Sequence, residues 1–171
     1  MLSVRTATTP EMIDTCHRIR HRAYAEANAW ESCDMAEMEM DGHDRRSAHT
    51  LVFWHDKPLA TGRLCLGPQL PLQSHLPDYP LPVGSMEVGR LCFPSPKIEA
   101  VFPREDVIGL LARGLEILRD NHGASDVFVL MRPALQRVLT RVGYRFVKLG
   151  PVVDLKGRRW LMRFEGKASA N

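Results

Sequence analysis

Two helical patterns in the second half of the chain each lie between strand-like segments, and this alternation limits the possible folds. Residues 104–122 carry an apolar stripe at helical spacing, and a second helix is expected from Pro133 to Gly143. Short apolar segments at 126–131 and 144–149 are typical of strands, and residues 152–155 and 159–164 predict a hairpin around Lys156-Gly157. Strands that alternate with helices indicate crossover connections and a mixed sheet with helices packed on it. We therefore expect an α/β (α+β) fold.

The first half of the chain predicts one helix followed by three strands. Residues 8–27 place apolar side chains three and four apart after a Thr-Pro start, which favours a capped helix. Residues 49–54, 58–66 and 86–93 are rich in branched and aromatic residues and predict strands. The connection at 67–85 has no regular pattern, and long connections of this kind are often binding loops.

Length and composition predict one globular domain without a membrane span. The 171 residues are 44% hydrophobic and 25% charged, close to average usage. No apolar run approaches the roughly 20 residues of a membrane helix, and residues 1–9 lack the apolar core of a secretory signal, so we expect a cytoplasmic protein. The four cysteines are scattered without a C-x-x-C pair, which argues against a zinc site or disulfide framework. The formal net charge of +3 does not indicate nucleic acid but is compatible with an acidic partner.

Polar and aromatic side chains between residues 20 and 90 follow neither the helical nor the strand period. Guanidinium, carboxylate and aromatic groups together are what a site needs to hold a small zwitterionic or cationic substrate. For any one of them alone, solvated surface, core packing or a helix cap is an equally good interpretation. The set comprises Arg20, Tyr24, Trp30, Glu39, Asp41, Asp44, Arg63, Glu87 and Arg90.

Arg63 lies inside a predicted strand and needs a partner if it faces the core. An unpaired buried guanidinium would be prohibitive, so a carboxylate must lie beside it. Arg20 and Tyr24 are one helical turn apart and share a face. The candidate partners of Arg63 are Asp41, Asp44 and Glu87.

Glu87 and Arg90 are three residues apart in the third predicted strand. Strict alternation would place them on opposite faces of the sheet. Gly89 lies between them and is a natural position for a bulge, which would change this arrangement. The sequence leaves both arrangements open.

The order of elements resembles that of the GCN5-related N-acyltransferases, and residues 20–90 resemble the LuxI-type acyl-homoserine-lactone synthases. The family's Arg, aromatic and Trp match Arg20, Tyr24 and Trp30. Its Glu-x-Asp-x-Phe-Asp motif matches residues 39–44 with His43 at the Phe position, its strand Arg matches Arg63, and its Glu-x-x-Arg-Phe strand matches residues 87–91. His49 and the segment 150–159 are more similar to N-acyl amino acid synthases and exosortase-associated acyltransferases.

The resemblance implies a mixed sheet with a splayed central strand pair and helices on both faces, in one N-acyltransferase domain over residues 1–171. Residues 1–48 would form an acceptor-side helix and loop. Residues 49–93 would supply the central strands, and residues 94–171 the helices and strands of an acyl groove. Within that groove, the strand 126–131 and the helix from Pro133 would line the acyl chain.

The chemistry that the resemblance implies is transfer of a fatty acyl group from a thioester to the amino group of an amino-acid-like acceptor, in particular S-adenosylmethionine, giving an acyl-homoserine lactone signal. Glu87 would act as the general base, and backbone amides of its strand would stabilise the oxyanion. Arg63 and Arg90 would hold the carboxylates in place. Arg20 would take the acceptor's carboxylate, and Tyr24 and Trp30 its sulfonium. Asp41 and Asp44 complete the substrate-binding set, with no metal and no tightly bound cofactor expected.

The donor is expected to be an acyl carrier protein thioester rather than coenzyme A. Coenzyme A-using members carry a glycine-rich loop before the central helix, and residues 94–104 contain no glycine. An acidic carrier would dock on surface arginines, although each is interpreted equally well as solvated decoration. The candidates are Arg104, Arg132, Arg137 and Arg141, with Arg113 beside them.

Three other functions remain open. The first is an N-acyl amino acid synthase of the same fold, which would not use S-adenosylmethionine. The second is an acetyltransferase that uses acetyl-coenzyme A. The third is a non-catalytic binding module of this fold, for which nucleic acid is a poor ligand because the arginines are spread over several elements.

Overall fold

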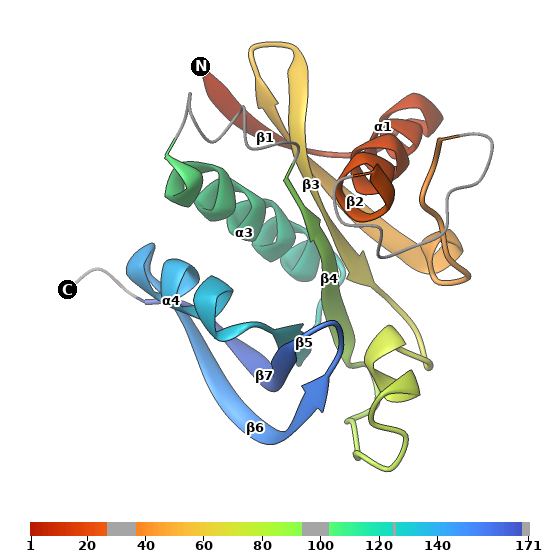
Figure 1. Cartoon of the computed structure of the whole chain (residues 1–171), viewed down its shortest axis with the longest axis vertical. Helices are drawn as coiled ribbons and strands as arrows, with labels where there is room; N and C mark the ends of the chain where they lie inside the picture. The colour runs from red at the N-terminus through yellow and green to blue at the C-terminus, as the bar shows by residue number, and fades with distance from the viewer. Residues whose placement is uncertain (27–36, 94–102, 125, 169–171) are drawn as a thin grey trace.

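The chain folds around one mixed β-sheet with helices on both faces (Figure 1). The computed structural model describes residues 1–26, 37–93, 103–124 and 126–168. Within them the sheet has seven strands in the order β1-β2-β3-β4-β5-β7-β6. All neighbouring strands are antiparallel except β4 and β5, which are parallel. The predicted α+β mixed sheet is therefore confirmed.

The elements follow the predicted order with one addition. The strands are β1 (Leu2–Thr6), β2 (Ser47–Trp54), β3 (Lys57–Cys65), β4 (Met86–Cys92), β5 (Val127–Met131), β6 (Tyr144–Asp154) and β7 (Arg158–Lys167). The helices are α1 (Pro10–His21), α3 (Arg104–Asn121) and α4 (Pro133–Arg141), with short turns at Arg22–Glu26, Asp44–Arg46 and Pro71–Ser74. None of the helices in these residues is long and apolar enough to cross a membrane.

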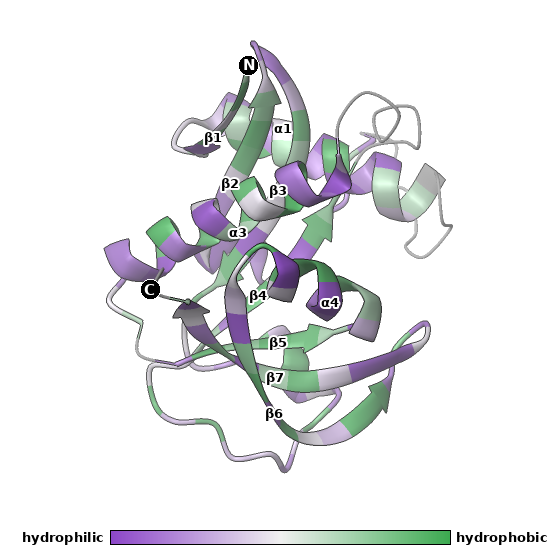
Figure 2. Cartoon of the chain, turned by 90° about the vertical axis from the view of Figure 1, so that its left-hand side faces the viewer, coloured by the Kyte–Doolittle hydropathy of each residue, from purple (hydrophilic) through white to green (hydrophobic). Residues whose placement is uncertain are grey.

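Helix α1 covers one face of the sheet. It begins as predicted, because the Thr9 hydroxyl accepts a hydrogen bond from the backbone N–H of Met12 at 3.3 Å and Pro10 occupies the first turn. Ile19 is buried against Leu51 of β2 on this side. Apolar and polar colours alternate along the strands and around the helices, as expected for elements with one buried side (Figure 2).

Helix α3 covers the opposite face. Val52 and Ala60 point to this side and pack against Val107 and Leu111 of the helix. The helix comes closest to the sheet at Gly114, where an added Cβ would lie 2.2 Å from Thr50 Oγ1 and 2.7 Å from a methyl carbon of Val4. Only glycine permits this approach.

The parallel pair β4 and β5 is splayed. The two strands are paired only at Met86 with Val127 and at Glu87 with Phe128, after which they separate. The predicted splay is confirmed.

A bulge in β4 decides the side on which its polar residues lie. Arg63 of β3 is opposite Gly89, and Thr61 is opposite Cys92, so one residue of β3, Gly62, lies opposite two of β4. Arg90 takes up the extra residue with φ of 51°, in the left-handed region. Glu87 and Arg90 consequently face the α1 side together, which is one of the two arrangements that the sequence left open.

Two strand assignments differ from prediction. Residues Leu2–Thr6 form an edge strand paired with β2, which the sequence did not predict because five residues carry little periodic signal. The predicted separate strands at 144–149 and 152–155 are one strand, β6. A register irregularity between Lys148 and Val152 marks the break that the sequence pattern indicated.

We expect a methyl group at position 114 to destabilise the fold. Gly114→Ala would overpack the helix–sheet contact and lower the free energy of unfolding by about 1–3 kcal/mol. Gly109→Ala is the matched control on the same helix, because its Cβ would meet only Val142 at 3.9 Å. That control should raise the free energy of unfolding by up to about 1 kcal/mol through helix propensity. Urea denaturation followed by circular dichroism measures both, and equal stabilities would contradict the close approach.

Candidate active site

A buried carboxylate, Asp44, lies between two buried arginines. Arg20 of α1 donates to it through Nη1 to Oδ1 at 2.5 Å and through Nη2 to Oδ2 at 3.1 Å, and Arg63 of β3 donates through Nη1 to Oδ1 at 2.8 Å. The Arg20 and Arg63 side chains are 0% and 2% exposed. Burial alone would raise the pKa of Asp44, but the hydrogen bonds and charge of Arg20 outweigh it and hold that pKa well below its usual range.

Two further carboxylates extend this ion-pair network to Arg90. Asp41 accepts from Arg63 Nη1 at 2.7 Å and from Arg90 Nη2 at 3.2 Å. Glu39 lies 3.0 Å from Arg90 Nη2 and also accepts from Arg20 Nε. Three guanidinium groups thus face three carboxylates, so the network is neutral overall and its desolvation is compensated.

The segment that carries these carboxylates is held by its own side chains. The Asp41 backbone N–H donates to Asp44 Oδ2 at 2.7 Å, and the His43 N–H donates to Asp41 Oδ1 at 2.9 Å. Short carboxylate side chains commonly close turns in this way. The Glu39 N–H donates to the backbone oxygen of His17 at 3.2 Å, which ties the segment to α1.

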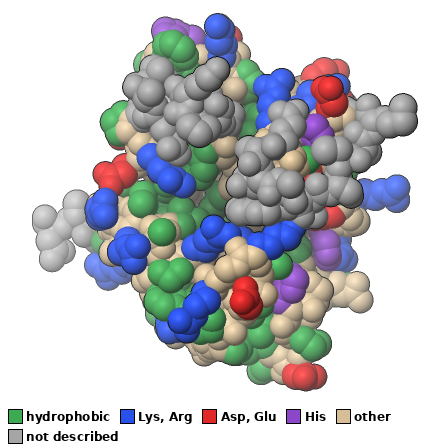
Figure 3. Space-filling model, in the orientation of Figure 1, with side chains coloured by type: hydrophobic (Ala, Val, Ile, Leu, Met, Phe, Trp, Pro, Cys, Tyr) green, Lys and Arg blue, Asp and Glu red, His purple; other side chains and the backbone are tan. Residues whose placement is uncertain are grey.

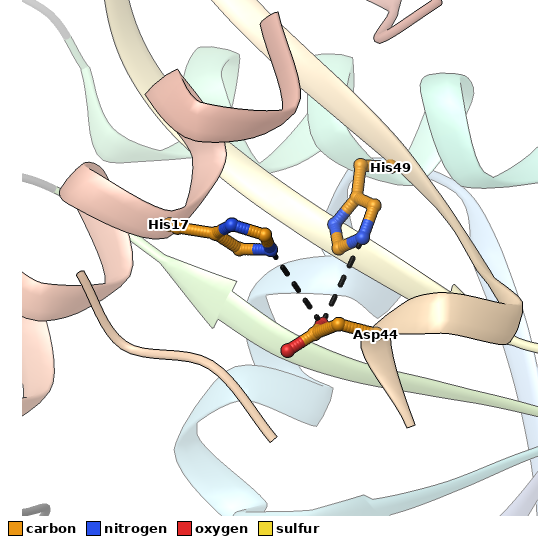
Figure 4. A group of neighbouring side chains, drawn as sticks. All are labelled: His17, Asp44 and His49. Atoms are coloured by element: carbon orange, nitrogen blue, oxygen red, sulfur yellow. Dashed lines mark ion pairs between the residues drawn. The ribbon is translucent and has the colours of Figure 1, made fainter. Parts of the chain in front are cut away.

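Two histidines pack beside Asp44 (Figure 4). The Nε2 atoms of His17 on α1 and His49 on β2 lie 3.9 Å and 3.8 Å from Asp44 Oδ1, and the two rings meet edge to face with centroids 5.7 Å apart. The three ligand atoms lie within 4.8 Å of one another, which resembles a metal site. The arrangement fits a cation poorly, because Oδ1 already accepts from Arg20 and Arg63 and a divalent ion would add charge beside two guanidinium groups.

Both imidazoles are favoured in the neutral form. Burial, followed by the charge of Arg20, lowers the pKa of His17, and burial lowers the pKa of His49 to about 4 against the pull of Asp44. A proton on either ring would place a further cation beside Arg20 and Arg63. The histidines therefore act as neutral packing for the ion-pair network.

Among the described carboxylates on this face, Glu87 is the one with a raised pKa. Burial raises its pKa to about 7, although the N–H of Leu72 and the charge of Arg63 oppose the shift. The Leu72 N–H donates to Oε2 at 2.7 Å, while Oε1 is directed along β4 towards Gly89. A carboxyl group with this pKa can accept a proton near neutral pH.

The connection 67–85 is part of this site. Leu72, in the turn Pro71–Ser74, is fully buried with Cys65 and Phe128, and its backbone orients Glu87. The sequence predicted a binding loop here without identifying Leu72, because a backbone donor leaves no signal in residue type.

Tyr24 lies between the ion-pair network and the core. The Arg90 guanidinium is 5.4 Å from the centre of the Tyr24 ring, and burial, followed by the neighbouring Cys92 thiol, raises the tyrosine's pKa well above its usual range. Burial also raises the pKa of Cys16 to about 11 and that of Cys92 to about 12, so neither is a thiolate nucleophile.

An apolar pocket lies on the opposite face of the splay, between β4, β5, α3 and α4. It encloses about 550 Å³ including its open mouth. Its strand side is formed by Val88, Leu91 and Phe93 with Val127, Val129 and Met131. Leu139 of α4 also lines it, as the sequence predicted for an acyl groove.

One predicted contact needs correction. Arg20 was expected to bind the acceptor's carboxylate, but it is fully buried and both Glu39 and Asp44 occupy its guanidinium. Its position in the core of the site makes it a positioning residue for the carboxylates. Trp30 lies outside the described residues, so its predicted contact stays a prediction.

The arginines predicted to dock a carrier protein differ in their exposure to solvent and in their partners. Arg104, Arg137 and Arg141 are exposed, and Arg141 Nη1 pairs with Glu105 at 2.6 Å. Arg132 is partly buried and donates to the backbone oxygen of Lys156. In the face drawn in Figure 3, Lys and Arg side chains lie around a recess in which apolar side chains are visible.

The predicted set includes Glu39 but assigns it no role, whereas the structure pairs it with Arg20 and Arg90. Two side chains beside the network, His17 and His49, are absent from the set, and His49 enters the sequence analysis only through its similarity to N-acyl amino acid synthases. His17 precedes Arg20 by three residues in the predicted helix, so helical spacing was the available signal that they share a face.

The architecture described above, a mixed sheet with a parted parallel pair next to a polar site, is the fold that the sequence resemblance implied. No protein-family model matches the sequence. No curated protein matches it either. Similarity to known proteins was therefore found through the three-dimensional fold and not through the sequence.

Among solved structures, the chain is similar to acyl-homoserine lactone synthases. The AHL synthase LasI matches with a TM-score of 0.78 and 16% identity over 96% of this chain and 89% of that chain. TofI, solved in a ternary complex with an inhibitor and MTA, matches with a TM-score of 0.73 and 20% identity over 95% of this chain and 90% of that chain. The CoA-dependent acyl-homoserine lactone synthase BjaI, solved with SAM and isopentyl-CoA, matches with a TM-score of 0.73 and 17% identity over 96% of this chain and 82% of that chain. The resemblance inferred from the sequence is confirmed at the level of the fold.

Removing Arg20 should unfold the site. Arg20→Met leaves Glu39 and Asp44 buried without their main partner, so the free energy of unfolding should fall by about 3–5 kcal/mol. Arg141→Met removes an exposed ion pair and should stay within about 1 kcal/mol of the unsubstituted protein. Chemical denaturation compares the two, and a small loss for Arg20→Met would show that the network does not support the fold.

His49 should make the protein sensitive to acid. Because its pKa is about 4 in the folded state and 6.5 in the unfolded state, the unfolded state binds more protons between these values. Stability is therefore lost as the pH falls from about 6.5 to 4, by an amount on the order of 3 kcal/mol for this group. The raised pKa of Glu87 has the opposite effect, because it makes the protein less stable as the pH rises. Glu87 is present both in the unsubstituted protein and in His49→Gln, so its effect cancels when the two are compared.

The difference between the two proteins isolates the histidine. Urea midpoints measured at pH 7 and pH 5 should fall further for the unsubstituted protein than for His49→Gln. Equal falls would mean that the ring is protonated in the folded state.

Proposed function

We propose that this protein is an N-acyltransferase that moves a fatty acyl group from a thioester to the amino group of an amino-acid-like acceptor. The single observation that carries the proposal is Glu87, a buried carboxyl group with a pKa of about 7 on the central strand beside the splay. The acceptor side is the face with the ion-pair network, and the acyl chain occupies the apolar pocket on the opposite face.

In the reaction, the acceptor amine attacks the thioester carbonyl carbon, and a carbon–nitrogen bond forms as the carbon–sulfur bond breaks. Glu87 takes the proton that the amine loses, directly or through a water, and the proton passes to the departing thiolate. The Glu87 carboxylate is held for this task by the Leu72 N–H, which leaves Oε1 directed towards the bulge.

The bulge supports the oxyanion that forms on the thioester carbonyl. Within the described residues, β4 is not paired with β5 beyond Glu87. The backbone between Gly89 and Leu91 thus borders the gap, where N–H groups directed into it would stabilise the oxyanion strongly as preorganised donors. The left-handed Arg90 fixes their direction and is itself held by Asp41 and Glu39.

S-Adenosylmethionine is the acceptor that we favour. After its amine is acylated, its own carboxylate would attack the γ-carbon next to the sulfonium and displace methylthioadenosine, giving an acyl-homoserine lactone. The similarity to BjaI, solved with SAM and isopentyl-CoA, supports this choice. Tyr24 and, by prediction, Trp30 would face the sulfonium, and Asp41, the most exposed of the three network carboxylates, would face the acceptor's cationic groups. The donor is an acyl carrier protein or coenzyme A thioester, with Arg104, Arg137 and Arg141 as docking residues for the former.

The second candidate is an N-acyl amino acid synthase. It is favoured by His49, which lies against Asp44 in this structure and belongs to the residues that resemble that group. The two candidates share the base and the acyl pocket and differ only in the acceptor.

Glu87→Gln tests the proposal. Transfer measured with a panel of acyl thioesters, and with S-adenosylmethionine or single amino acids as acceptor, should lose about 10²–10⁴-fold in kcat. In the unsubstituted protein kcat should rise with pH and level off above about 7, because only ionised Glu87 accepts a proton. The glutamine can still accept from the Leu72 N–H, so the fold should survive.

The control is Glu165→Gln, which changes an exposed carboxylate on β7 paired with Arg163. Its rate should match that of the unsubstituted protein. Mass spectrometry of the product distinguishes lactone from free acyl amino acid. An unchanged rate and pH profile for Glu87→Gln would exclude Glu87 as the base.

A further inference from the structure

The apolar pocket contains one buried carboxylate, Glu116 of α3. The residue is 8% exposed and lies among the apolar side chains that line the pocket. Its Oε2 accepts from Arg113 Nη1 at 2.8 Å, and the Arg113 side chain reaches solvent with 56% of its surface exposed. Nothing in the acyl-transfer chemistry described above uses this group.

The pocket runs along α3, and Glu116 lies near the end remote from the splay. Ile108 packs with Met131 and Phe93, where β4 and β5 have separated. Further along the helix, Leu115 packs with Val127, where β4 and β5 are still paired. The lining residues from Ile108 to Arg119 span about 16 Å along the helix axis.

The remote end is polar on its helix side and aromatic on its sheet side. The Arg119 guanidinium lies 5.1 Å from the centre of the Phe164 ring, and Phe146 packs against Phe164 with centroids 5.5 Å apart. The charge of Glu116 also contributes, after burial, to the raised pKa of Tyr144. A chain threaded from the splay along α3 would therefore meet the Glu116 carboxylate, which is paired with Arg113 outside the pocket, after passing only apolar groups.

We infer that Glu116 is a specificity-determining residue that limits the length of the alkyl chain the pocket accepts. The inference rests on the proposed acyl transfer. A methylene gains binding energy only where it meets apolar surface, and an alkyl end pressed against Glu116 and Arg113 would strip water from the ion pair without replacing its hydrogen bonds. Chains that end before Glu116 bind with full benefit, and longer chains do not.

Glu116→Leu tests this assignment. It replaces the carboxylate by an apolar group and leaves Arg113 solvated at the surface, so no buried charge is left unpaired. We expect the ratio of kcat/KM for the longer over the shorter chain to rise about fourfold for each methylene that reaches position 116. The substrates are hexanoyl, octanoyl, decanoyl and dodecanoyl thioesters of N-acetylcysteamine, with S-adenosylmethionine or an amino acid as acceptor.

Two further variants keep the test decisive. Glu116→Gln preserves the shape, removes the charge and should shift the length profile in the same direction by a smaller factor. Glu105→Leu makes the same change on the same helix at a partly exposed ion pair with Arg141 and should leave the length profile unaltered. A length profile unchanged in folded Glu116→Leu and Glu116→Gln, or changed equally in Glu105→Leu, would overturn the inference.

A binding measurement separates this inference from the proposed function. Calorimetric titration of the same thioesters, without an acceptor, should show the chain-length limit in the unsubstituted protein and its relief in Glu116→Leu. If no acceptor is acylated but the limit and its relief are measured, the proposed transfer fails and the pocket assignment stands. If transfer occurs and neither readout depends on position 116, the reverse holds.

Discussion

The site depends on one buried carboxylate that two arginines from different elements share. Asp44 joins Arg20 on α1 to Arg63 on β3, and the side chains of all three are almost completely excluded from solvent. Each charge is tolerable only because the others are present, since an unpaired ion in the core would cost several kcal/mol. The network therefore fixes the helix, the strand and the intervening segment in one arrangement.

This constraint extends to the groups assigned to catalysis. Asp41 and Glu39 hold Arg90, and Arg90 occupies the left-handed residue of the β4 bulge. The same bulge turns Arg90 to the face on which Glu87 lies, and β4 is no longer paired with β5 beyond Glu87. An electrostatic network on one side of the sheet thus sets the backbone geometry at the splay, where a thioester carbonyl would lie.

The two faces of the sheet offer different environments to the two substrates. The ion-pair network on the α1 face consists of charged groups whose charges sum to zero, which suits an acceptor with an amino group and a carboxylate. The α3 face is apolar apart from Glu116 and Arg119, which suits an alkyl chain. The gap between β4 and β5 is the place where both faces are accessible to one thioester, so the splay allows the amine and the acyl carbon to meet.

Much of this could be predicted from the residues alone. The helix and strand periods predicted the mixed sheet. The need of a strand arginine for a carboxylate indicated Asp41, Asp44 and Glu87 as candidate partners of Arg63, and the first two are bonded to it. The resemblance of residues 39–44 and 87–91 to a known motif indicated which side chains converge. These features are local or follow from charge balance, so they can be inferred from the amino-acid sequence.

Other features depend on contacts between distant segments. The edge strand Leu2–Thr6 forms because β2 offers it a partner, and Arg20 is a core residue because Asp44 reaches it. Gly89 permits a bulge, but only the pairing with β3 decided that one forms at Arg90. The Leu72 N–H on Glu87 and the position of Glu116 in the pocket leave no trace in residue spacing. The sequence determined which chemical groups are available, and the tertiary structure decided which are buried, since burial and backbone direction are set by what packs against each residue.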